Sequence, residues 1–426
     1  MAIDNKDKKV LKSSIEREQN EVACSAECEK IKGSKNLNVP HLRFPEFSGE
    51  WKKCIIQDYG EVITGNTPPT NNAEYYNNGS YLWASPADLG TGKKINDTKT
   101  KLSESGFKKT RIIPKGSILV TCIGSTIGKI GMAVETMSSN QQINSIIVNE
   151  KSNNDFVYYA ISRAFPRYLS EVGVQAVPIL SKSNFEKLPN YTTSIEEQDK
   201  TGYFLNLLDE RIATQNKIIE DLKKLKSAII ERHYSQAEKQ IVCVADLGEP
   251  FNVGNLAKDD LAETGMPCVI YGELFTTYGE TISQIESHTN KTEGMILSKK
   301  GDLLFPSSTT VDAMSLIAPS VINVDGVILG GDMFGIHIST NFNAQYLSYY
   351  FNHIAKRQLA KFAKGSTIIH LHYTDIEKAR LLLPSLEEQN KMANCLISLD
   401  EKIRVEKSYL QLLDKQKAYL LRQMFI

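Results

Sequence analysis

The chain contains one segment twice, and the two copies stand 191 residues apart. Residues 194–212 read SIEEQDKTGYFLNLLDERI and residues 385–403 read SLEEQNKMANCLISLDEKI, with ten identities in 19 aligned positions. Solenoid repeats span only about 20 to 50 residues, so a repeat unit of this length does not indicate a solenoid. It predicts a duplicated domain.

Each copy continues as a predicted long amphipathic helix. Apolar residues recur at alternating steps of three and four, which is the spacing of a coiled-coil seam. They are Leu205, Leu208, Ile212, Ile219, Leu222 and Ile229 in the first helix, and Leu396, Leu399, Ile403, Leu410, Leu413 and Leu420 in the second. About 40 residues at 1.5 Å each make a rod of about 60 Å. We interpret the helices as a spacer.

Polar residues interrupt the two seams at matching places. They are Gln215 and Lys226 in the first helix and Glu406 and Lys417 in the second. Polar seam residues lower stability but fix the register of a helix pair. The helices are therefore predicted to pair with each other. The alternative is two ordinary amphipathic helices, each packed on its own domain.

Composition restricts the class of protein. Of the 426 residues, 41% are apolar and 23% are charged, as in soluble proteins of two or three domains. No apolar run approaches the roughly 20 residues that span a bilayer, and the first residues lack the apolar core of a signal peptide. We expect a cytoplasmic protein, and its seven scattered Cys are typical of reduced thiols.

The chain divides into five parts by composition and repeat. Residues 1–39 form a polar extension without a sustained apolar period. Two globular parts, residues 40–193 and 238–384, each begin near a shared Asp-x-Gly-Glu, at Asp58 and at Asp246. Each is followed by its long helix, residues 194–237 and 385–426. The repeat unit is therefore a globular domain followed by a helix.

The two globular parts share an outline and little sequence. Residues 115–120 correspond to 300–305 as a turn leading into a strand, and residues 156–159 correspond to 346–349 as the start of an aromatic helix. The segments GNTPPTNNAEYYNNGSYLW and TTYGETISQIESHTN have no partner in the other half. One scaffold carrying two different surfaces suits a protein that recognises two unlike targets.

Each half also has a basic stretch, although the chain as a whole has 50 basic and 50 acidic residues. Zero net charge argues against a non-specific nucleic-acid coat and leaves local basic surfaces open. The first stretch, residues 92–115, has Lys93, Lys94, Lys99, Lys101, Lys108, Lys109, Arg111 and Lys115 against two acids, and the second, residues 343–364, has Lys356, Arg357, Lys361 and Lys364 against none. Such residues beside Gly, Ser, Thr and Asn are typical of contacts to phosphates and base edges.

Catalytic motifs are incomplete. Residues 124–129, GSTIGK, are one residue short of a phosphate-binding loop, and Ile130 stands where Ser or Thr would bind magnesium. Residues 66–70, NTPPT, resemble the base-holding tetrapeptide of amino-methyltransferases but carry an inserted Thr and lack the stacking aromatic residue. Residues 86–88 and 97–99 are a poor match to a nuclease site. We find no catalytic constellation.

Metal-binding patterns are also incomplete. Cys24 and Cys28 are the one close cysteine pair, and no second Cys or His pair follows at finger spacing. His370 and His372 would point to one side of a strand and could bind a metal, but no third ligand is nearby. A contact or packing role is the preferred interpretation for the two histidines.

Three features together resemble the DNA-specificity subunit of type I restriction-modification enzymes. They are the duplicated domain-plus-helix plan, the Ser-Ile/Leu-Glu-Glu-Gln helix start, and the run GSTIGKIG followed by Asn140 to Asn144. The resemblance covers residues 40–426. It implies an α+β fold in which two target recognition domains are joined and spaced by two long helices, paired as an antiparallel coiled coil with an internal pseudo-two-fold repeat.

The resemblance also implies a function. Each domain would bind one half of a split site in double-stranded DNA, and the chain itself would have no catalytic activity. Partners would be two modification subunits, which use S-adenosylmethionine to methylate adenine, and in the full enzyme two restriction subunits that use ATP and Mg²⁺. No cofactor is expected in this chain.

The expected DNA contacts follow from the basic stretches and the matched motifs. Phosphate contacts are expected from Lys93, Lys94, Lys108, Lys109, Arg111, Lys129, Lys356, Arg357, Lys361 and Lys364, and base contacts from Gln141, Gln142, Ser366, Thr367 and His370. The matching helix starts, residues 196–198 and 387–389, are expected to form docking surfaces for the modification subunits. Two other hypotheses stay open: a complete DNA methyltransferase or nuclease with a divergent site, and a coiled-coil scaffold without a nucleic-acid role.

Overall fold

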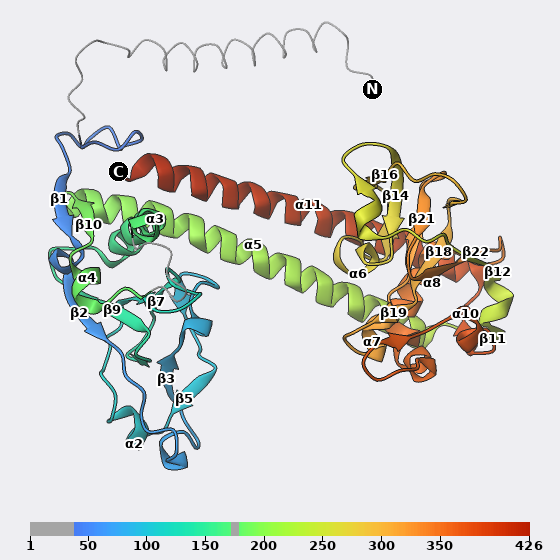
Figure 1. Cartoon of the computed structure of the whole chain (residues 1–426), viewed down its shortest axis with the longest axis horizontal. Coiled ribbons are helices and arrows are strands. Elements are labelled where there is room, and N and C mark those ends of the chain that lie inside the picture. The colour runs from blue at the N-terminus through green and yellow to red at the C-terminus, as the bar shows by residue number, and fades with distance from the viewer. Residues whose placement is uncertain (1–37, 172–178) are drawn as a thin grey trace, which may run out of the picture. The chain divides into compact units, whose positions relative to one another are not determined.

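The computed structural model describes residues 38–171 and 179–426. They form two compact units: the first comprises the described residues up to Ile212 together with 412–426, and the second comprises residues 213–411. Two long helices, α5 (Ile195–Gln236) and α11 (Leu386–Met424), run through both units (Figure 1). Of the predicted N-terminal extension, residues 1–37 lie outside the described part of the chain.

A five-stranded sheet is the central layer of the first unit, with strand order β2-β9-β6-β7-β4. Strand β6 (Ile118–Thr121, ILVT) is buried at every residue, as a short apolar run predicts for a central strand. It pairs antiparallel with β9 and β7, whereas β4 pairs parallel with β7. The remaining strands of this sheet are β2 (Gly60–Thr64), β4 (Lys94–Ile95), β7 (Ile130–Ala133) and β9 (Ile143–Val148).

A smaller sheet, a two-stranded ribbon and short helices complete the first unit. The smaller sheet has the order β5-β3-β8, and the ribbon β1-β10 leads into α5. The strands are β1 (Lys52–Ile55), β3 (Tyr81–Ala84), β5 (Thr100–Leu102), β8 (Ser138–Ser139) and β10 (Pro189–Thr192). The helices are α2 (Glu104–Phe107), α3 (Asn154–Glu171) and α4 (Lys182–Glu186), with 3-10 turns η1 (Ile56–Asp58), η2 (Ala73–Tyr75) and η3 (Pro86–Asp88).

The second unit repeats this plan. Its main sheet has the order β12-β22-β18-β20-β15, in which β18 pairs antiparallel with β22 and β20, and β15 pairs parallel with β20. Its second sheet is larger, with the order β13-β16-β14-β21-β17. The strands of the two sheets are β12 (Gly248–Asn252), β13 (Leu261–Ala262), β14 (Met266–Ile270), β15 (Thr281–Ile282), β16 (Ser287–Thr289), β17 (Ile296–Leu297), β18 (Asp302–Pro306), β20 (Ser320–Ile322), β21 (Ile328–Gly330) and β22 (Met333–Ile338).

Two ribbons and short helices surround these sheets. The ribbons pair β11 (Gln240–Cys243) with β24 (Arg380–Leu383), and β19 (Ser308–Thr309) with β23 (Ile369–His370). The helices are α6 (Glu273–Thr276), α7 (Ala313–Leu316), α8 (Ala344–Tyr350), α9 (Lys356–Leu359) and α10 (Tyr373–Ile376). Shorter turns are η4 (Val244–Leu247), η5 (Lys258–Asp260), the π-helical turn η6 (Phe351–Ala355) and η7 (Ala360–Phe362).

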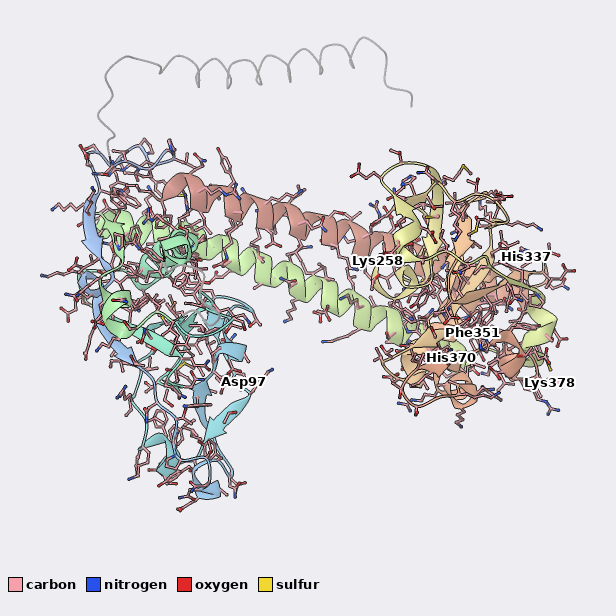
Figure 2. All side chains as sticks on the ribbon, in the orientation of Figure 1. Asp97, Lys258, His337, Phe351, His370 and Lys378 are labelled. Carbon is pink, nitrogen blue, oxygen red and sulfur yellow. The ribbon has the colours of Figure 1, made fainter. Side chains whose placement is uncertain are left out.

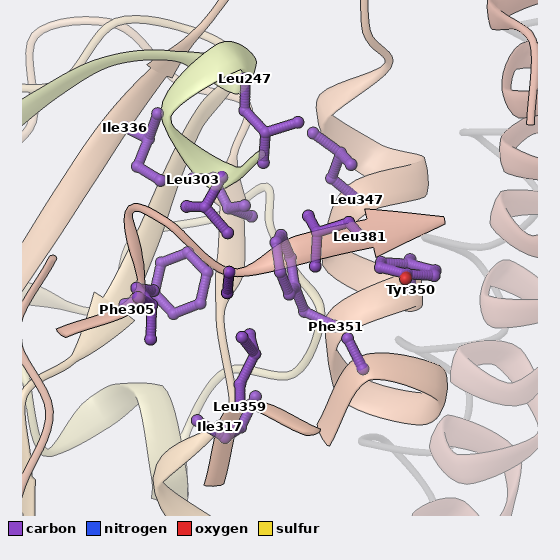
Figure 3. Packing of buried hydrophobic residues seen from close by; sticks show 14 of the residues in the cluster. Leu247, Leu303, Phe305, Ile317, Ile336, Leu347, Tyr350, Phe351, Leu359 and Leu381 are labelled. Atoms are coloured by element: carbon purple, nitrogen blue, oxygen red, sulfur yellow. The ribbon is translucent and has the colours of Figure 1, made fainter. Parts of the chain in front are cut away.

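The core of the second unit lies between its main sheet and α8. Leu303 and Phe305 of β18 pack with Ile336 of β22 and Leu381 of β24, and Figure 3 shows their side chains converging. The rings of Phe305 and Phe351 meet edge to face, with centroids 5.2 Å apart. Such an aromatic pair contributes about 0.5–1.5 kcal/mol beyond the burial of its area. The core therefore ties the sheet to the helical segment that follows it.

Within the second unit the long helices pair antiparallel. Gln215 donates from Nε2 to Glu406 Oε2 at 2.5 Å, Lys226 Nζ lies 2.7 Å from Asp400 Oδ1, and His233 Nε2 lies 3.3 Å from Glu388 Oε2. Residue numbers fall along α11 as they rise along α5. Because Gln215 and Lys226 are only 4% and 6% exposed, the prediction that polar interruptions lie inside a helix pair is confirmed.

The predicted seam residues occupy the inner faces of α5 and α11. Leu205, Leu208, Ile219, Leu396, Ile403, Leu413 and Leu420 are buried, and Ile212, Leu222, Ile229, Leu399 and Leu410 are half-buried. In the first unit, Lys417 of α11 contacts Asp209 of α5, with Nζ 2.5 Å from Oδ1. In the part of the chain that the structure describes, no helix is both long and apolar enough to cross a membrane.

The diverged sequence segments do have structural partners, which corrects the interpretation from sequence. The segment TTYGETISQIESHTN includes β15 and β16, which take the places of β4 and β5 in the first unit. Likewise β3, which begins in the segment GNTPPTNNAEYYNNGSYLW, corresponds to β14. Strand β3 pairs parallel with β8, which precedes β9, and β14 pairs parallel with β21, which precedes β22. The divergence therefore lies in the side chains and loops, and the strand order is shared.

Candidate nucleic-acid interface

In the first unit, the loop after β2 and the loop before β9 meet at one end of the main sheet. The backbone N–H of Asn66 donates to the carbonyl of Ser139 at 2.9 Å, which joins the two loops. The hydroxyl of Thr67 donates to Gln141 Oε1 at 2.5 Å. Gln141 is exposed and Gln142 is half-buried, with its Oε1 accepting from Asn140 at 3.1 Å. We call residues 139–142 the first reading loop.

Asn66 also holds a third segment in place. Its amide donates to the carbonyl of Lys109 at 2.9 Å and accepts from the backbone N–H of Arg111 at 2.8 Å. The Arg111 guanidinium donates to the carbonyl of Thr64 at 2.6 Å and stays exposed. One asparagine thus brings two basic residues beside two glutamines, a combination that suits phosphate and base-edge contacts.

Asn66 and Thr67 belong to this candidate interface by their contacts and were not predicted from the sequence. They belong to the NTPPT run, which resembles a methyltransferase motif only in part. The available signal was their position, two and three residues after a strand that ends at Thr64. Polar residues directly after a strand often form a site, because a rigid strand positions them.

The other basic candidates of the first unit lie on several elements. Lys108 is exposed and pairs with Glu104 at 2.6 Å, one turn away on the α2 segment. Lys94 of β4 is exposed and lies 3.7 Å from Glu210 of α5, on the helix side of the unit. Lys129 is half-buried, and its stem packs against Gly90. Exposed pairs of this kind are weak, about 0–1 kcal/mol, so Lys94 and Lys108 remain able to contact DNA.

Lys93 is a correction, because it is only 7% exposed. Its ammonium contacts Asp155 at 2.6 Å, Asn206 at 2.9 Å and the Tyr159 hydroxyl at 3.2 Å. Burial lowers the pKa of this ammonium, although the hydrogen bond to Asp155 acts in the opposite direction. A cation enclosed by α3 and α5 cannot reach a phosphate, so the expected DNA contact of Lys93 is wrong.

In the second unit, residues 364–370 form an exposed hairpin. The backbones of Lys364 and His370 exchange two hydrogen bonds, of 2.9 and 2.7 Å, and Ser366 and Thr367 lie exposed between them. Figure 2 labels His370, which β23 presents. Its ring stacks on that of His372 with centroids 6.1 Å apart. The structure therefore brings the predicted residues of the hairpin together.

Charge around the hairpin is mixed. Lys364 Nζ lies 2.5 Å from Asp375 Oδ1, and this hydrogen bond is the main cause of a lowered pKa of the Asp375 carboxyl. Lys356 and Arg357 lie on α9 and Lys361 on η7, of which Arg357 and Lys361 are exposed and Lys356 is half-buried. Within residues 38–171 and 179–426, no group of three or more His, Cys, Asp and Glu side chains could hold a metal ion.

Two glutamines anchor the starts of the long helices. Gln198 accepts from the backbone N–H of Asn153 at 3.0 Å, and Gln389 accepts from that of Asn343 at 3.0 Å. Both donate back to the carbonyl just before their own helix, at 2.9 Å in each case. Each glutamine thus fastens its helix to the preceding aromatic helix, α3 or α8.

The expected docking surface at the helix starts needs correction for this reason. Gln198 and Gln389 are each 1% exposed, and Glu197 is 2% exposed. The Glu197 carboxylate accepts from Arg43 Nε at 2.7 Å and from Trp51 Nε1 at 3.2 Å. These side chains hold the domain to its helix and are closed to a partner protein. Glu196 and Glu387 remain exposed.

Comparison with known proteins identifies the family. The model of the type I restriction modification DNA specificity domain matches residues 48–224 and again 237–415. The MjaIX specificity subunit of Methanocaldococcus jannaschii is 29% identical over 195 residues, which cover 44% of this chain and 45% of that protein. The MjaVIII specificity subunit of the same organism is 23% identical over 402 residues, which cover 88% and 91%.

A solved structure has the same fold. The S subunit of a type I restriction-modification system from M. genitalium superimposes with a TM-score of 0.59 at 16% identity, over 91% of this chain and 99% of that one. The two matches to the family model correspond to the two domain-plus-helix repeats seen in the sequence, of which the first ends with α5 and the second with α11. This chain therefore belongs to the type I restriction-modification DNA-specificity family and carries two specificity domains in tandem.

Proposed function

We propose that this chain is a non-catalytic specificity subunit whose two domains each bind one half of a split double-stranded DNA site. The main support is one observation: the two main sheets share their strand order, while the loops at the same sheet end carry different side chains. A shared scaffold with unlike loops suits two different half-sites approached in the same way. The paired helices α5 and α11 set the gap between the half-sites.

Catalysis in this proposal belongs to partner subunits. Two modification subunits carry S-adenosylmethionine and methylate adenine, and two restriction subunits with ATP and Mg²⁺ join them in the full enzyme. Exposed apolar side chains that share a face of a long helix, such as Leu412 and Tyr419 two turns apart on α11, support the binding of proteins there, because an apolar patch often marks a contact surface. Tyr203 is 63% exposed, Leu412 62% and Tyr419 60%.

Methylome sequencing of a host with and without the gene tests the function. A split adenine-methylated motif should be present with the gene and absent without it. An unchanged methylome would contradict the proposal. A host expressing the Thr367→Ala variant, which changes one exposed hairpin residue, should keep the first half of the motif unchanged.

Partner number is tested separately. The purified complex should contain two modification subunits for each copy of this chain, measured by native mass spectrometry. The double variant Leu412→Lys with Tyr419→Lys should weaken that binding, because lysine on an apolar contact surface is costly to desolvate. Lys415→Ala on the same helix is the matched control, and equal binding by both variants would exclude this surface.

A further inference from the structure

The first reading loop has a structural counterpart in the second unit. In the first unit, the N–H of Cys122 donates to the carbonyl of Gln142 at 2.8 Å, and in the second, the N–H of Ser307 donates to that of Asp332 at 2.8 Å. The strands that follow, β9 and β22, pair with β2 and β12 in the same register, Asn144 with Thr64 and Phe334 with Asn252. Gly331 and Asp332 therefore occupy the places of Gln141 and Gln142.

A pocket lies beside Gly331 in the second unit. In the first unit the side chain of Gln141 fills the space beside Thr67. In the second, Gly331 has no side chain and a φ of +93°, and a Cβ built on it would lie 3.0 Å from Cδ1 of Tyr271. A pocket of about 450 Å³ remains beside it, lined by Asn255, Tyr271, Gly331 and Asp332 among others.

The polar groups that line this pocket are available to a ligand. Within the described residues, the side chains of Asn255, Tyr271 and Asp332 have no hydrogen-bond partner. Asn255 is exposed, Tyr271 is 37% exposed and Asp332 is half-buried. A carboxylate, an amide and a phenol thus line the same small space, and polar groups placed together in this way favour a specific hydrogen-bonding ligand.

We propose that this pocket, which we call the second reading pocket, binds the edge of a base that carries an exocyclic amino group, cytosine or adenine. The inference rests on the proposed function. An ionised carboxylate only accepts hydrogen bonds. In the major groove, cytosine N4 and adenine N6 are donors, whereas guanine O6 and thymine O4 are acceptors. Asp332 therefore attracts cytosine and adenine and repels guanine and thymine.

Asn255 separates the two possible bases. An asparagine amide can both donate to adenine N7 and accept from adenine N6, a pairing that cytosine cannot offer. If adenine is the ligand, Asn255→Ala lowers the preference as strongly as a change at Asp332. If cytosine is the ligand, the effect of Asn255→Ala is smaller, because Asp332 alone accepts from N4.

The test uses the full chain purified with its modification subunits and DNA duplex libraries randomised in one half-site at a time. Wild type should prefer cytosine or adenine at one position by on the order of tenfold to a hundredfold. Asp332→Asn, whose amide can also donate, should accept guanine or thymine there and leave the other half-site unchanged. Asp259→Asn, an exposed carboxylate on η5, is the matched control and should behave as wild type.

Two results would overturn the inference, and they have different consequences for the proposed function. An Asp332→Asn complex that melts like wild type and keeps its base preference would exclude the pocket while the proposed function stands. A wild-type complex without preference in either half-site would contradict the proposed function and the pocket together. Asn255→Ala adds an independent variant, and an unchanged preference in both variants, each melting like wild type, would exclude the pocket.

Discussion

In both units a tyrosine, an aspartate and a lysine hold a long helix in place, but the charged residue beside these three side chains has the opposite sign in the two units. In the first unit, Tyr159 donates to Asp209 at 2.6 Å and Lys417 contacts the same carboxylate. In the second, Tyr349 donates to Asp400 at 2.6 Å and Lys226 contacts it. The same set therefore recurs: a tyrosine from α3 or α8, an aspartate from the long helix of the same repeat, and a lysine from the opposite long helix.

The residue beside these three side chains is Lys93 in the first unit and Glu280 in the second. The carbonyl of Lys93 accepts from Met132 beside β4, and the carbonyl of Glu280 accepts from Val321 beside β15, so the two residues are equivalent. Glu280 lies 3.0 Å from Lys226 Nζ and 3.0 Å from His353 Nε2. The comparison indicates that the tyrosine, aspartate and lysine maintain the fold, while the charge beside them is specific to each unit.

The consequence for stability differs between the units. Burial alone would raise the pKa of the Glu280 carboxyl, but the hydrogen bond with His353 and the charge of Lys226 outweigh it and lower the pKa to about 2. For Lys93, burial outweighs the partners and lowers the pKa. The charged form is thus favoured by folding at Glu280 and disfavoured at Lys93.

The largest effect is expected from Lys226→Met. This change leaves Glu280 and Asp400 without their cation, and breaking a buried ion pair costs about 3–5 kcal/mol. Hydrogen exchange of α8 peptides in the intact chain measures the free energy of local opening. Lys417→Met is the matched variant and should cost about 1–2 kcal/mol at α3, because the Lys417 side chain is 26% exposed and contacts Asp209, whereas the Lys226 side chain is 8% exposed and contacts both Glu280 and Asp400. Equal costs would contradict the proposed difference.

A second prediction concerns acid. Because the pKa of Glu280 is lower in the folded state than its ordinary value of 4.5, its stabilisation is fully present above about pH 5 and is lost as the pH falls towards 2. The expected loss is about 3 kcal/mol. It should be seen in α8 exchange between these pH values, corrected for intrinsic rates. Glu280→Gln should remove that part of the acid dependence, and parallel curves for variant and wild type would argue against it.

A third prediction concerns Lys93→Met. A methionine keeps the apolar stem and removes a charge that burial disfavours, and the Asp155 carboxylate that loses its partner is 31% exposed and stays hydrated. Opening of α3 should therefore change by less than about 1 kcal/mol. A loss as large as that of Lys226→Met would mean that Lys93 is as essential to its unit as Lys226 is to the other.

The smallest effect separates buried from exposed lysines in DNA binding. Lys109→Ala should lower the salt dependence of binding by about one ion, because an exposed lysine beside the first reading loop neutralises one phosphate. Lys93→Met should leave that slope unchanged. Fluorescence anisotropy across a salt series measures both variants, and a lowered slope for Lys93→Met would restore it as a phosphate contact.

Local and repeated signals in the sequence predicted the helix pair well. Gln215 and Glu406 stand at equivalent positions of the two repeats, where each interrupts an apolar seam. The structure accounts for both polar residues, because Gln215 donates a hydrogen bond to Glu406. The aromatic helix starts and the strands after Gly116 and Gly301 were also predicted. Each of these strands follows a turn that needs a glycine with positive φ, +86° at Gly116 and +93° at Gly301. Such features depend on residues close in sequence.

The errors depend on contacts between distant residues. Lys93 stands in a basic run, and it is a buried cation because it contacts Tyr159 and Asn206, which are 66 and 113 residues away in sequence. Strands of two or three residues, such as β15 and β16, are too short to have an apolar period, so their existence follows from pairing with distant strands. The pocket beside Gly331 is lined by residues from separate segments, among them Asn255, Tyr271 and Asp332, so no local sequence pattern marks it.

The most direct test of two reading domains at a fixed distance is a paired insertion in the long helices. Four residues inserted after Ile212 in α5 and four after Gln411 in α11 lengthen both helices by about 6 Å, and insertions of four are tolerated in coiled coils as a local unwinding. DNA advances about 3.4 Å per base pair. Methylome sequencing should show the gap longer by one or two base pairs with both half-sites unchanged, whereas an unchanged gap would contradict the account.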